Sequence, residues 1–372
     1  MQSAQAESIV VSLTEAPAAA DLAQDWIALE AVADGSFFTS WTWIGAWLRG
    51  LPLALRPRLL RASIAGHVVG LGLLTPNIQR RHGLIRSRAL FLNATGDPAY
   101  DNITAEYNGF LVERSVRERV LQAFMRHLLA SSEWEELHLN AMTEPPLGLS
   151  GAAKVSVLSR ERNSYLIDLA KVRSQAGGYL ALLGQKARYS VRHSLKDCGL
   201  YGDLSVQVAD TTADALRLLE ELTHLHSTHW NARGDGGAFA TPFANAFHRD
   251  LVLSGVTRGE IQLVHVRAGS HSVGYLYNFV YRGRVLTYQA GINYSLLPRS
   301  ASPGLASHSL AVQLNADLGH AIYDFMVGDQ QYKRALCTDT ANQYWVVLRR
   351  DRLKFRLEDA LRRMRNRLRA EA

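Results

Sequence analysis

Residues 260–289 read EIQLVHVRAGSHSVGYLYNFVYRGRVLTYQ, and this stretch decides the fold class. Its apolar and aromatic runs predict three strands, at 260–266, 272–281 and 284–289. The next segment contains Ser302-Pro303-Gly304, which is a strong helix start and predicts a helix over 303–318. A strand at 321–325 follows that helix, and a last strand is predicted at 343–348. Three strands, a helix and a further strand predict a mixed α/β or α+β sheet protein.

The elements on either side of this stretch repeat the same order. The second half begins with a strand at 164–169, a basic helix at 179–198, a strand at 204–209 and helices at 214–230 and 241–253. The first half has a strand at 8–13, two helices between 20 and 50, strands at 58–65, 67–74, 87–92 and 107–112, a helix at 114–130 and a strand at 135–140. Glu144-Pro145-Pro146-Leu147-Gly148 separates the halves. The order alone predicts a duplicated unit, because no residue-level repeat is present.

The length and composition are those of a globular protein. The chain has 372 residues, of which 47% are hydrophobic and 20% charged, which excludes a disordered or disulfide-dense chain. We predict domains at 1–160 and 161–350 and a terminal helix at 351–372. Cys198 and Cys337 form neither a disulfide framework nor a metal knuckle. No apolar run reaches the roughly 18 residues of a membrane span, and the N-terminus lacks a signal-peptide pattern, so we expect a cytoplasmic setting.

The positive charge is concentrated at the C-terminus. The net charge is +7, and residues 349–372 contain ten arginines or lysines against four acidic residues. An apolar helical face runs through this segment, formed by Leu353, Leu357, Leu361, Met364 and Leu368. Three interpretations are open: a helix docked on the body, a peripheral helix on a membrane surface, or a helix that binds RNA or another anionic partner.

Several segments carry residues suited to chemistry. The backbone N–H groups of a helix beginning at Ser302-Pro303-Gly304 suit a phosphate or pyrophosphate. Asp324 ends a strand and could act as a base or orient an amine, or it could simply cap a local turn. His226 and Trp230 share a helix face, and His248 is a second cleft candidate. The histidine spacing lacks a metal-site pattern, so no metal is predicted.

Other segments are less specific. The cations between Gln185 and Lys196 form a basic helical stripe that could guide an anionic ligand or simply face solvent. Trp43 and Trp47 share a helix face and are expected in the core. The polar loop at 97–102 could rim a cleft. No P-loop, nucleophile elbow, kinase motif or dinucleotide-binding glycine pattern occurs.

The ordered set of short motifs resembles one known family. It comprises WTWIGAW at 41–47, KARYSVR at 186–192, LHSTHW at 225–230, SPG at 302–304 and YDFMVGD at 323–329, then Tyr332-Lys333. This set is similar to the BioF2-like or CelD-like acetyltransferases of the GNAT superfamily, which are related to the Fem aminoacyl ligases. The resemblance spans residues 35–350. It departs from the family pattern at His229, at Gln330 and at Leu336-Cys337.

The resemblance implies two tandem GNAT-like folds and acyl transfer, expected to be acetyl transfer, from acyl-CoA to an amine or hydroxyl. The thioester is expected where the strands at 284–289 and 321–325 separate. The implied catalytic residues are Asp324, His226 and Tyr332. The implied CoA-binding residues are Gln289, Ser302, Pro303, Gly304 and Leu305, and the implied acceptor-binding residues are Trp230, His248 and Lys333.

The resemblance also suggests a pathway and leaves alternatives open. Relatives act in exopolysaccharide or cell-envelope biosynthesis, so an acceptor from such a pathway, and a location at the inner membrane, are plausible associations. One alternative is a Fem-like transferase with aminoacyl-tRNA as donor, whose basic stripe and tail would contact RNA. Another is a non-catalytic module of the same fold that docks through its basic tail.

Overall fold

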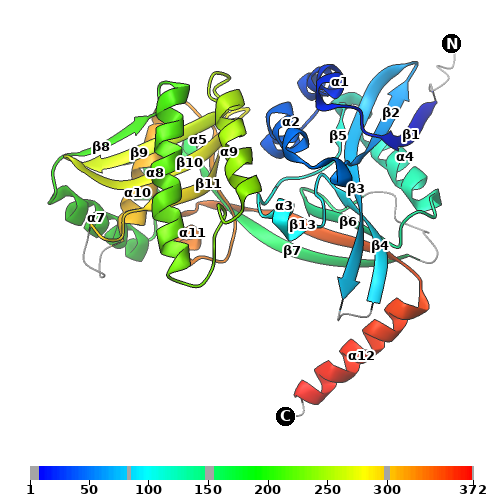
Figure 1. Ribbon diagram of the computed structural model, residues 1–372. Helices are drawn as coiled ribbons and strands as arrows, with labels where there is room; N and C mark the ends of the chain where they lie inside the picture. The colour runs from blue at the N-terminus through cyan, green and yellow to red at the C-terminus, as the bar shows by residue number, and fades with distance from the viewer. Residues whose placement is uncertain (1–7, 82–84, 147–154, 297–301, 371–372) are drawn as a thin grey trace.

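The computed structural model describes residues 8–81, 85–146, 155–296 and 302–370. In this part of the chain the strands form one mixed sheet of 13 strands with helices packed in two lobes (Figure 1). The sheet order is β1-β2-β3-β4-β6-β13-β7-β12-β11-β10-β9-β8, with β5 beside β3. The strands are β1 (Ile9–Glu15), β2 (Arg58–Ile64), β3 (His67–Arg81), β4 (Ile85–Leu92), β5 (Leu111–Val112), β6 (Glu136–Met142), β7 (Val155–Asp168), β8 (Leu204–Val208), β9 (Ile261–Ala268), β10 (His271–Tyr281), β11 (Arg284–Ile292), β12 (Ile322–Val327) and β13 (Asp339–Arg350).

Helices connect these strands and cover the sheet. In the second half the predicted helix over 179–198 is two helices, α6 and α7, which meet at Leu183-Gly184. The helices are α1 (Ala19–Val32), α2 (Trp41–Gly50), α3 (Pro98–Asp101), α4 (Arg117–Ala130), α5 (Leu169–Ser174), α6 (Gly178–Leu182), α7 (Gln185–Gly199), α8 (Thr212–Asn231), α9 (Pro242–Gly255), α10 (Pro303–Asp317), α11 (Gln331–Leu336) and α12 (Leu353–Ala370). The mixed class predicted from the sequence is confirmed.

The two halves have the same topology. In the first half β1 to β4 are antiparallel neighbours, and β4 then pairs in parallel with β6 after the helix α4. In the second half β8 to β11 are antiparallel neighbours, and β11 pairs in parallel with β12 after α10. The chain therefore contains two tandem units of one topology, as the repeated order of elements predicts.

Two long strands join the halves into one sheet. β7 and β13 pair antiparallel from Leu166↔Asp339 to Val155↔Arg350, while β13 also pairs with β6 and β7 with β12. Both are longer than the strands predicted at 164–169 and 343–348. The added part of β7, from Val155 to Asn163, is mostly exposed and largely polar, so it lacks the apolar pattern of a strand. The predicted boundary between residues 160 and 161 falls within β7.

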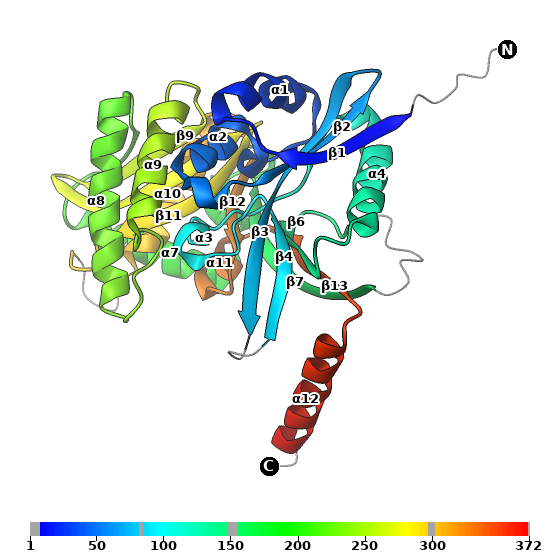
Figure 2. The same cartoon turned by 45° about the vertical axis from the view of Figure 1, so that its right-hand side comes forward.

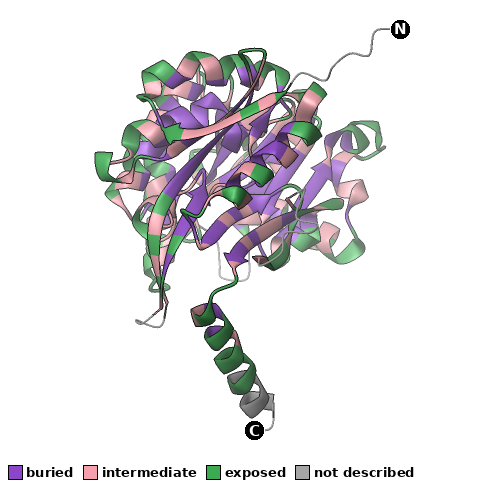
Figure 3. Cartoon of the chain, turned by 90° about the vertical axis from the view of Figure 1, so that its right-hand side faces the viewer, coloured by how far each residue is buried: buried purple, intermediate pink, exposed green. Residues whose placement is uncertain are grey.

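An aromatic core lies between the halves and holds them together. Trp43 and Trp47 on α2 are each 1% exposed, which confirms their predicted place in the core. The ring of Phe37 stacks on that of Phe279 at 4.2 Å between centroids, and Trp43 meets Phe247 of α9 edge to face at 4.8 Å. Figure 3 shows the buried residues concentrated along the sheet and the inner faces of the helices. Because this core includes residues of both halves, a loop of the first half has a fixed position against the second.

The C-terminal helix α12 projects away from the body (Figures 1 and 2). Only its beginning docks: Phe355 is buried, and Glu358 forms an ion pair with Arg349 at 3.0 Å. Of the three interpretations left open, docking on the body holds for this beginning, and the apolar face stays outward, since Leu357 and Leu361 are 57% and 61% exposed. Phe355 lies on the opposite side of the helix from these leucines, as 3.6 residues per turn requires.

Candidate active site

The site begins where two neighbouring strands separate. β11 and β12 pair in parallel only from Arg284↔Ile322 to Leu286↔Asp324. Beyond this point β11 continues along β10, with a register shift that leaves Tyr288 as a bulge, while β12 ends at Val327. The separation expected from the family resemblance is thus present, and it opens part of the edge of β11.

A cleft of about 1470 Å³ lies at this opening. It is bounded by the beginnings of α7 and α10, the end of α8, the edge of β11 and the segment from Met326 to Cys337. Eight of the residues singled out from the sequence line it: His226, Trp230, Gln289, Ser302, Gly304, Leu305, Tyr332 and Lys333. Asp324, His248 and Pro303 are buried and do not line it.

One end of the cleft suits an anionic group. Ser302 stands at the N-cap position of α10, but its side chain makes no capping bond. Ser194 of α7 replaces it: its Oγ accepts from the Ala306 N–H at 3.2 Å and donates to the Ser302 carbonyl at 2.7 Å. Around Gly304 there is open space, since a Cβ there would meet only Ile292, at 3.8 Å. The exposed Lys186 and the first turn of α7 line the same cleft, so a cation and a second helix N-terminus add positive potential to it.

A carboxylate of the first half reaches the other end of the cleft. Glu106 is 6% exposed and, within the described residues, is the one carboxylate that lines the cleft. Its Oε2 accepts from the Val327 N–H at 2.9 Å and from Gln343 Nε2 at 3.0 Å. Burial raises the pKa of Glu106 to about 7, with Asp324 adding to the shift and Lys333 opposing it. A carboxylate with such a pKa is suited to take a proton at neutral pH.

Sequence reasoning missed Glu106. It predicted a rim at 97–102 and a strand over 107–112, where only Leu111–Val112 is a strand. The backbone between them is unusual, since Thr104 and Tyr107 have φ values of 36° and 47°. Non-glycine residues with such angles often mark functional segments. The pattern of the sequence gives no sign of these angles.

Asp324 lies behind the cleft and organises it. It is fully buried, its Oδ2 accepts from the Tyr107 hydroxyl at 2.6 Å, and its Oδ1 accepts from the Met326 N–H at 2.7 Å. Arg284 Nε lies 3.8 Å from Oδ2. The bond to Met326 is the local turn cap that the sequence left open as the alternative role. The predicted role as a base is therefore not the one that this geometry favours: a carboxylate without access to the cleft cannot meet an acceptor.

The two histidines proposed from the sequence, His226 and His248, are held within the fold and are not free to act in the cleft. His226 Nδ1 lies 3.3 Å from the Ala290 carbonyl, and Nε2 accepts from the Ala238 N–H at 3.2 Å. Burial lowers its pKa, so the ring is neutral and both nitrogens are engaged, which leaves neither free to take a proton. His248 is completely buried, with its ring 5.6 Å from that of Tyr277 and 5.2 Å from that of Tyr288. It cannot touch an acceptor in the cleft.

Tyr332 and Lys333 both face the cleft from α11. Tyr332 stacks on His308 at 5.3 Å, and burial raises the pKa of its phenol to about 12, so it carries a proton at neutral pH. Lys333 is buried and its Nζ donates to the Val327 carbonyl at 2.8 Å. Burial lowers the pKa of Lys333, and Glu106 and Asp324 oppose that shift. Lys333 is therefore held beside the carboxylates rather than extended into solvent.

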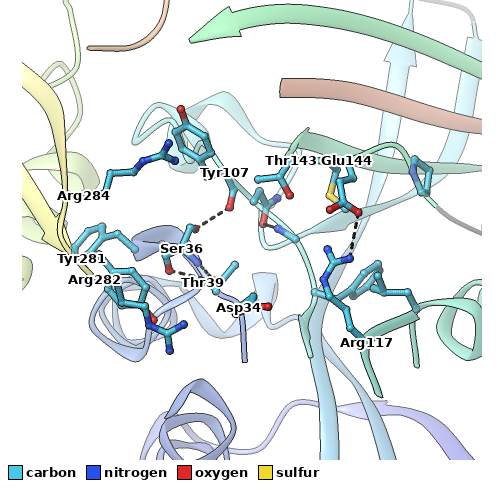
Figure 4. A pocket seen from close by; sticks show the side chains of 18 of the residues that line it. Asp34, Ser36, Thr39, Tyr107, Arg117, Thr143, Glu144, Tyr281, Arg282 and Arg284 are labelled. Carbon is cyan, nitrogen blue, oxygen red and sulfur yellow. Dashed lines mark hydrogen bonds and ion pairs between the residues drawn. The ribbon is translucent and has the colours of Figure 1, made fainter. Parts of the chain in front are cut away.

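A second, smaller pocket of about 310 Å³ lies on the other side of Tyr107 (Figure 4). Residues of both halves line it, including Ser36, whose Oγ donates to the Tyr107 carbonyl at 2.7 Å, and Arg284. Arg117 pairs with Glu144 at its rim at 3.1 Å. The adjacent residues Glu106 and Tyr107 therefore line different cavities: Glu106 lines the large cleft, and Tyr107 lines the small pocket.

Two further features concern cofactors and membranes. Among the described residues, no group of three or more His, Cys, Asp or Glu side chains is arranged to hold a metal ion. In the same residues, none of the helices has the length and apolarity needed to cross a bilayer.

Comparisons with known proteins agree with this architecture. Residues 185–334 match the family described as acetyltransferase (GNAT) domain. Among curated proteins no significant match was found. Among solved structures, FemX superposes with a TM-score of 0.55 at 10% identity, covering 90% of this chain and 96% of that one.

Two synthetases have similar folds. The C-terminal (DUF2156) domain of a lysylphosphatidylglycerol synthetase from Agrobacterium fabrum gives a TM-score of 0.53 at 11% identity and covers 93% of this chain and 95% of that one. L-PGS from Bacillus licheniformis gives 0.54 at 9% identity, covering 89% and 92%. At such identities the likeness is one of fold. Residues 185–334 thus match an acetyltransferase (GNAT) domain, and the chain as a whole shares its two-unit fold with FemX.

Proposed function

We propose that the chain transfers an acyl group from acyl-CoA to an amine or hydroxyl acceptor in the large cleft. One observation carries the proposal: β11 and β12 separate beyond Leu286 and Asp324, and the gap opens between the bare helix start at Gly304 and the buried carboxylate of Glu106. An acyl-CoA in this gap would have its pyrophosphate next to the helix start at Gly304 and its thioester next to the carboxylate of Glu106.

The donor would bind along β11 with its pyrophosphate at Gly304. The backbone there is open, because only Ile292 lies within 4 Å of a Cβ built on that glycine. The beginning of α7 and Lys186 add positive charge. The N-terminal end of a helix favours phosphate through its free N–H groups and its dipole. Leu305 and Gln289, which also line the cleft, would contact the pantetheine arm.

The thioester carbonyl would be polarised from β11 rather than from β12. The N–H groups of Met326 and Val327 on β12 already donate to Asp324 and Glu106. The edge of β11 beyond Leu286 has no strand opposite it, so its backbone N–H groups are the better oxyanion donors. Trp230 and Lys333 would contact the acceptor.

The proton transfers follow from the same geometry. Both bonds to Glu106 involve Oε2, which within the described residues leaves Oε1 to take the acceptor's proton. The acceptor then attacks the carbonyl carbon, the C–S bond breaks, and the thiolate takes a proton from the Tyr332 phenol. Glu106 holds the role that the sequence gave to Asp324 and His226, and those two act as positioning residues.

The acyl group and the acceptor are expected from the family resemblance alone. Acetyl-CoA is the first donor to test. Amino sugars and other precursors of exopolysaccharide or envelope polymers are the first acceptors. Lys333 and Trp230 support an acceptor with a polar ring, since a buried ammonium and an indole face are both present.

Calorimetric titration with CoA and acetyl-CoA tests the donor site. We expect saturable micromolar binding, and a loss of at least about tenfold in affinity for Gly304→Glu, whose carboxylate would repel the pyrophosphate. Gly199→Glu is the matched control, because that glycine is exposed at the end of α7 with nothing near its Cβ position. Equal affinity in both variants would contradict this site. Thiol release from acetyl-CoA, measured across the acceptor panel, then tests transfer.

A second candidate donor is aminoacyl-tRNA, which the resemblance to the Fem ligases implies. Exposed cations at the cleft, Lys186, Arg233 and Arg334, favour it. Binding of charged tRNA that falls steeply with salt, together with no binding of CoA, would support this donor over acyl-CoA.

A further inference from the structure

The apolar stripe of α12 is mostly exposed to solvent. Leu353, Leu357, Leu361 and Met364 follow one side of the helix and are 72%, 57%, 61% and 56% exposed. Four such side chains over about 18 Å of helix are more than the scattered apolar residues of an ordinary surface. Figures 1 and 2 show the helix standing clear of both lobes.

The attachment of α12 keeps this stripe outward. Phe355 is buried beneath two guanidinium groups, with Arg349 4.8 Å and Arg81 5.3 Å from its ring centroid. Glu358, 4% exposed, pairs with Arg349 at 3.0 Å, and Lys354 Nζ donates to the Arg86 carbonyl at 2.7 Å. These contacts fasten the first turns of the helix to the β3–β4 hairpin and to β13. They use a different side of the helix from the leucines, so docking and exposure of the stripe are compatible.

The charge of α12 indicates which kind of partner can cover the apolar stripe. From Leu353 to Ala370 the sequence contains seven arginines and lysines against two acidic residues, Glu358 and Asp359. Both acids face Arg349, at 3.0 and 3.4 Å. Pairing with the same helix of a second copy would bring two strongly cationic segments together, which disfavours a dimer. An anionic surface with an apolar layer beneath it complements both features.

We propose that α12 is an interfacial helix that binds anionic lipid membranes. Leu353, Leu357, Leu361 and Met364 insert among the acyl chains, and the basic residues meet the phosphates of the headgroups. Phe355 and Glu358 hold the helix in a fixed direction, so the body is carried at the membrane surface. The inference is independent of the proposed function, because the stripe is no part of either pocket.

Cosedimentation of the full-length protein with vesicles tests the proposal. We expect binding to phosphatidylcholine vesicles that contain about 30 mol% phosphatidylglycerol, weak binding to pure phosphatidylcholine, and a decrease with salt. The variant Leu357→Glu/Leu361→Glu should lose at least about tenfold in partitioning, because burial of two leucines is removed and like charge is added. Its melting temperature and catalytic activity should be unchanged, since both leucines are more than half exposed and neither lines a pocket.

The matched control is Leu253→Glu/Leu318→Glu. These leucines are 50% and 55% exposed on α9 and after α10, so the control makes the same change of charge outside α12. It should bind vesicles like the wild type. Equal loss in the two variants, equal binding to neutral and anionic vesicles, or no vesicle binding by the wild type would overturn the proposal. A wild-type dimer that only the α12 variant dissociates, without vesicle binding, would assign the stripe to a second copy.

Discussion

The two halves share one topology but differ at the point where their parallel strands separate. In the second half the gap between β11 and β12 opens into the large cleft. In the first half the corresponding gap between β4 and β6 is filled by the chain itself. Asn108 donates its backbone N–H to the Ala141 carbonyl at 2.8 Å and its Nδ2 to the carbonyls of Leu92 and Asn140 at 2.9 and 3.2 Å.

The segment that fills the first gap also supplies the second. Glu106 and Tyr107 immediately precede Asn108, and they reach Val327 and Asp324 of the other half. The opening of the second unit is thus filled in the first, and the filling segment places Glu106 at the cleft and Tyr107 on Asp324 of the other half. The two copies of the unit therefore differ in function: the second half forms most of the cleft, and the first half supports it and adds Glu106 to its lining.

The largest effect is expected when the contribution of the first half is removed by Glu106→Gln. The amide can still accept from the Val327 N–H, so the fold should persist, but it cannot take a proton. We expect turnover with acetyl-CoA and an active acceptor to fall about a thousandfold, equivalent to about 4 kcal/mol. The affinity for CoA should not change.

The pH dependence gives a second check on Glu106. Its pKa of about 7 means that the rate in the wild type should rise with pH and level off above that value. Glu30→Gln is the control, because this carboxylate is also largely buried but bonds to the Trp41 N–H and Tyr281 away from the cleft. A Glu106→Gln enzyme with wild-type turnover would rule out the base.

The next effect concerns the filled gap itself. Asn108→Ala removes the bonds to Leu92 and Asn140 and those that Asn93 Nδ2 and the Gly109 N–H make to Oδ1, both at 2.8 Å. We expect a loss of about 3 kcal/mol in the free energy of unfolding, measured by denaturant titration, since buried partners are left unsatisfied. Asn77→Ala, which loses one bond, to the Thr95 carbonyl, should lose about 1 kcal/mol. Equal losses in the two variants would show that the bonds of Asn108 in the filled gap contribute no more stability than an ordinary side-chain hydrogen bond.

Asp324→Asn tests the contact between Tyr107 of the first half and Asp324 of the second, and its expected effect is smaller. We expect about a tenfold lower turnover, or about 1.4 kcal/mol, with the fold kept. Because the charge of Asp324 raises the pKa of Glu106, its removal should also shift the pH–rate profile to lower pH. Tyr107→Phe loses the same hydrogen bond but keeps the charge, so its profile should not shift. If Asp324→Asn leaves the pH–rate profile unchanged, the charge of Asp324 does not influence the pKa of the catalytic group.

The sequence predicted most of the scaffold and only part of the site. Apolar and aromatic runs located the three strands before Pro303, because these strands are largely buried, and the Ser302-Pro303-Gly304 start located the helix that follows. The sequence could not locate Glu106, whose partners Val327 and Gln343 are more than 200 residues away and meet it only when the sheet is complete. Nor could it tell that Asp324 points behind the cleft, since a strand pattern does not say what covers each face. In α12 the stripe was visible, but the single residue that fixes its docking, Phe355, was not.

The smallest effect sharpens the same contrast within the aromatic core. In the first half the buried Trp26 Nε1 donates to the Thr39 carbonyl at 2.9 Å, whereas in the second half neither nitrogen of the buried His248 has a partner among the described residues. Burial lowers the pKa of His248 from 6.5 to about 3.

As the pH falls below 6.5, His248 therefore takes up a proton in the unfolded chain but not in the folded chain, so the folded state loses stability. This loss amounts to about 1 kcal/mol between pH 6.5 and 5.5. In His248→Phe the loss should be smaller by this amount, while the buried His308, whose pKa burial also lowers, keeps its own share. Stability at pH 7 should stay within about 1 kcal/mol of the wild type because the ring volume is conserved. Chemical denaturation at the two pH values measures it, with the exposed His67→Phe as control. A His248→Phe variant that loses as much stability as the wild type would show that this histidine takes up its proton inside the fold.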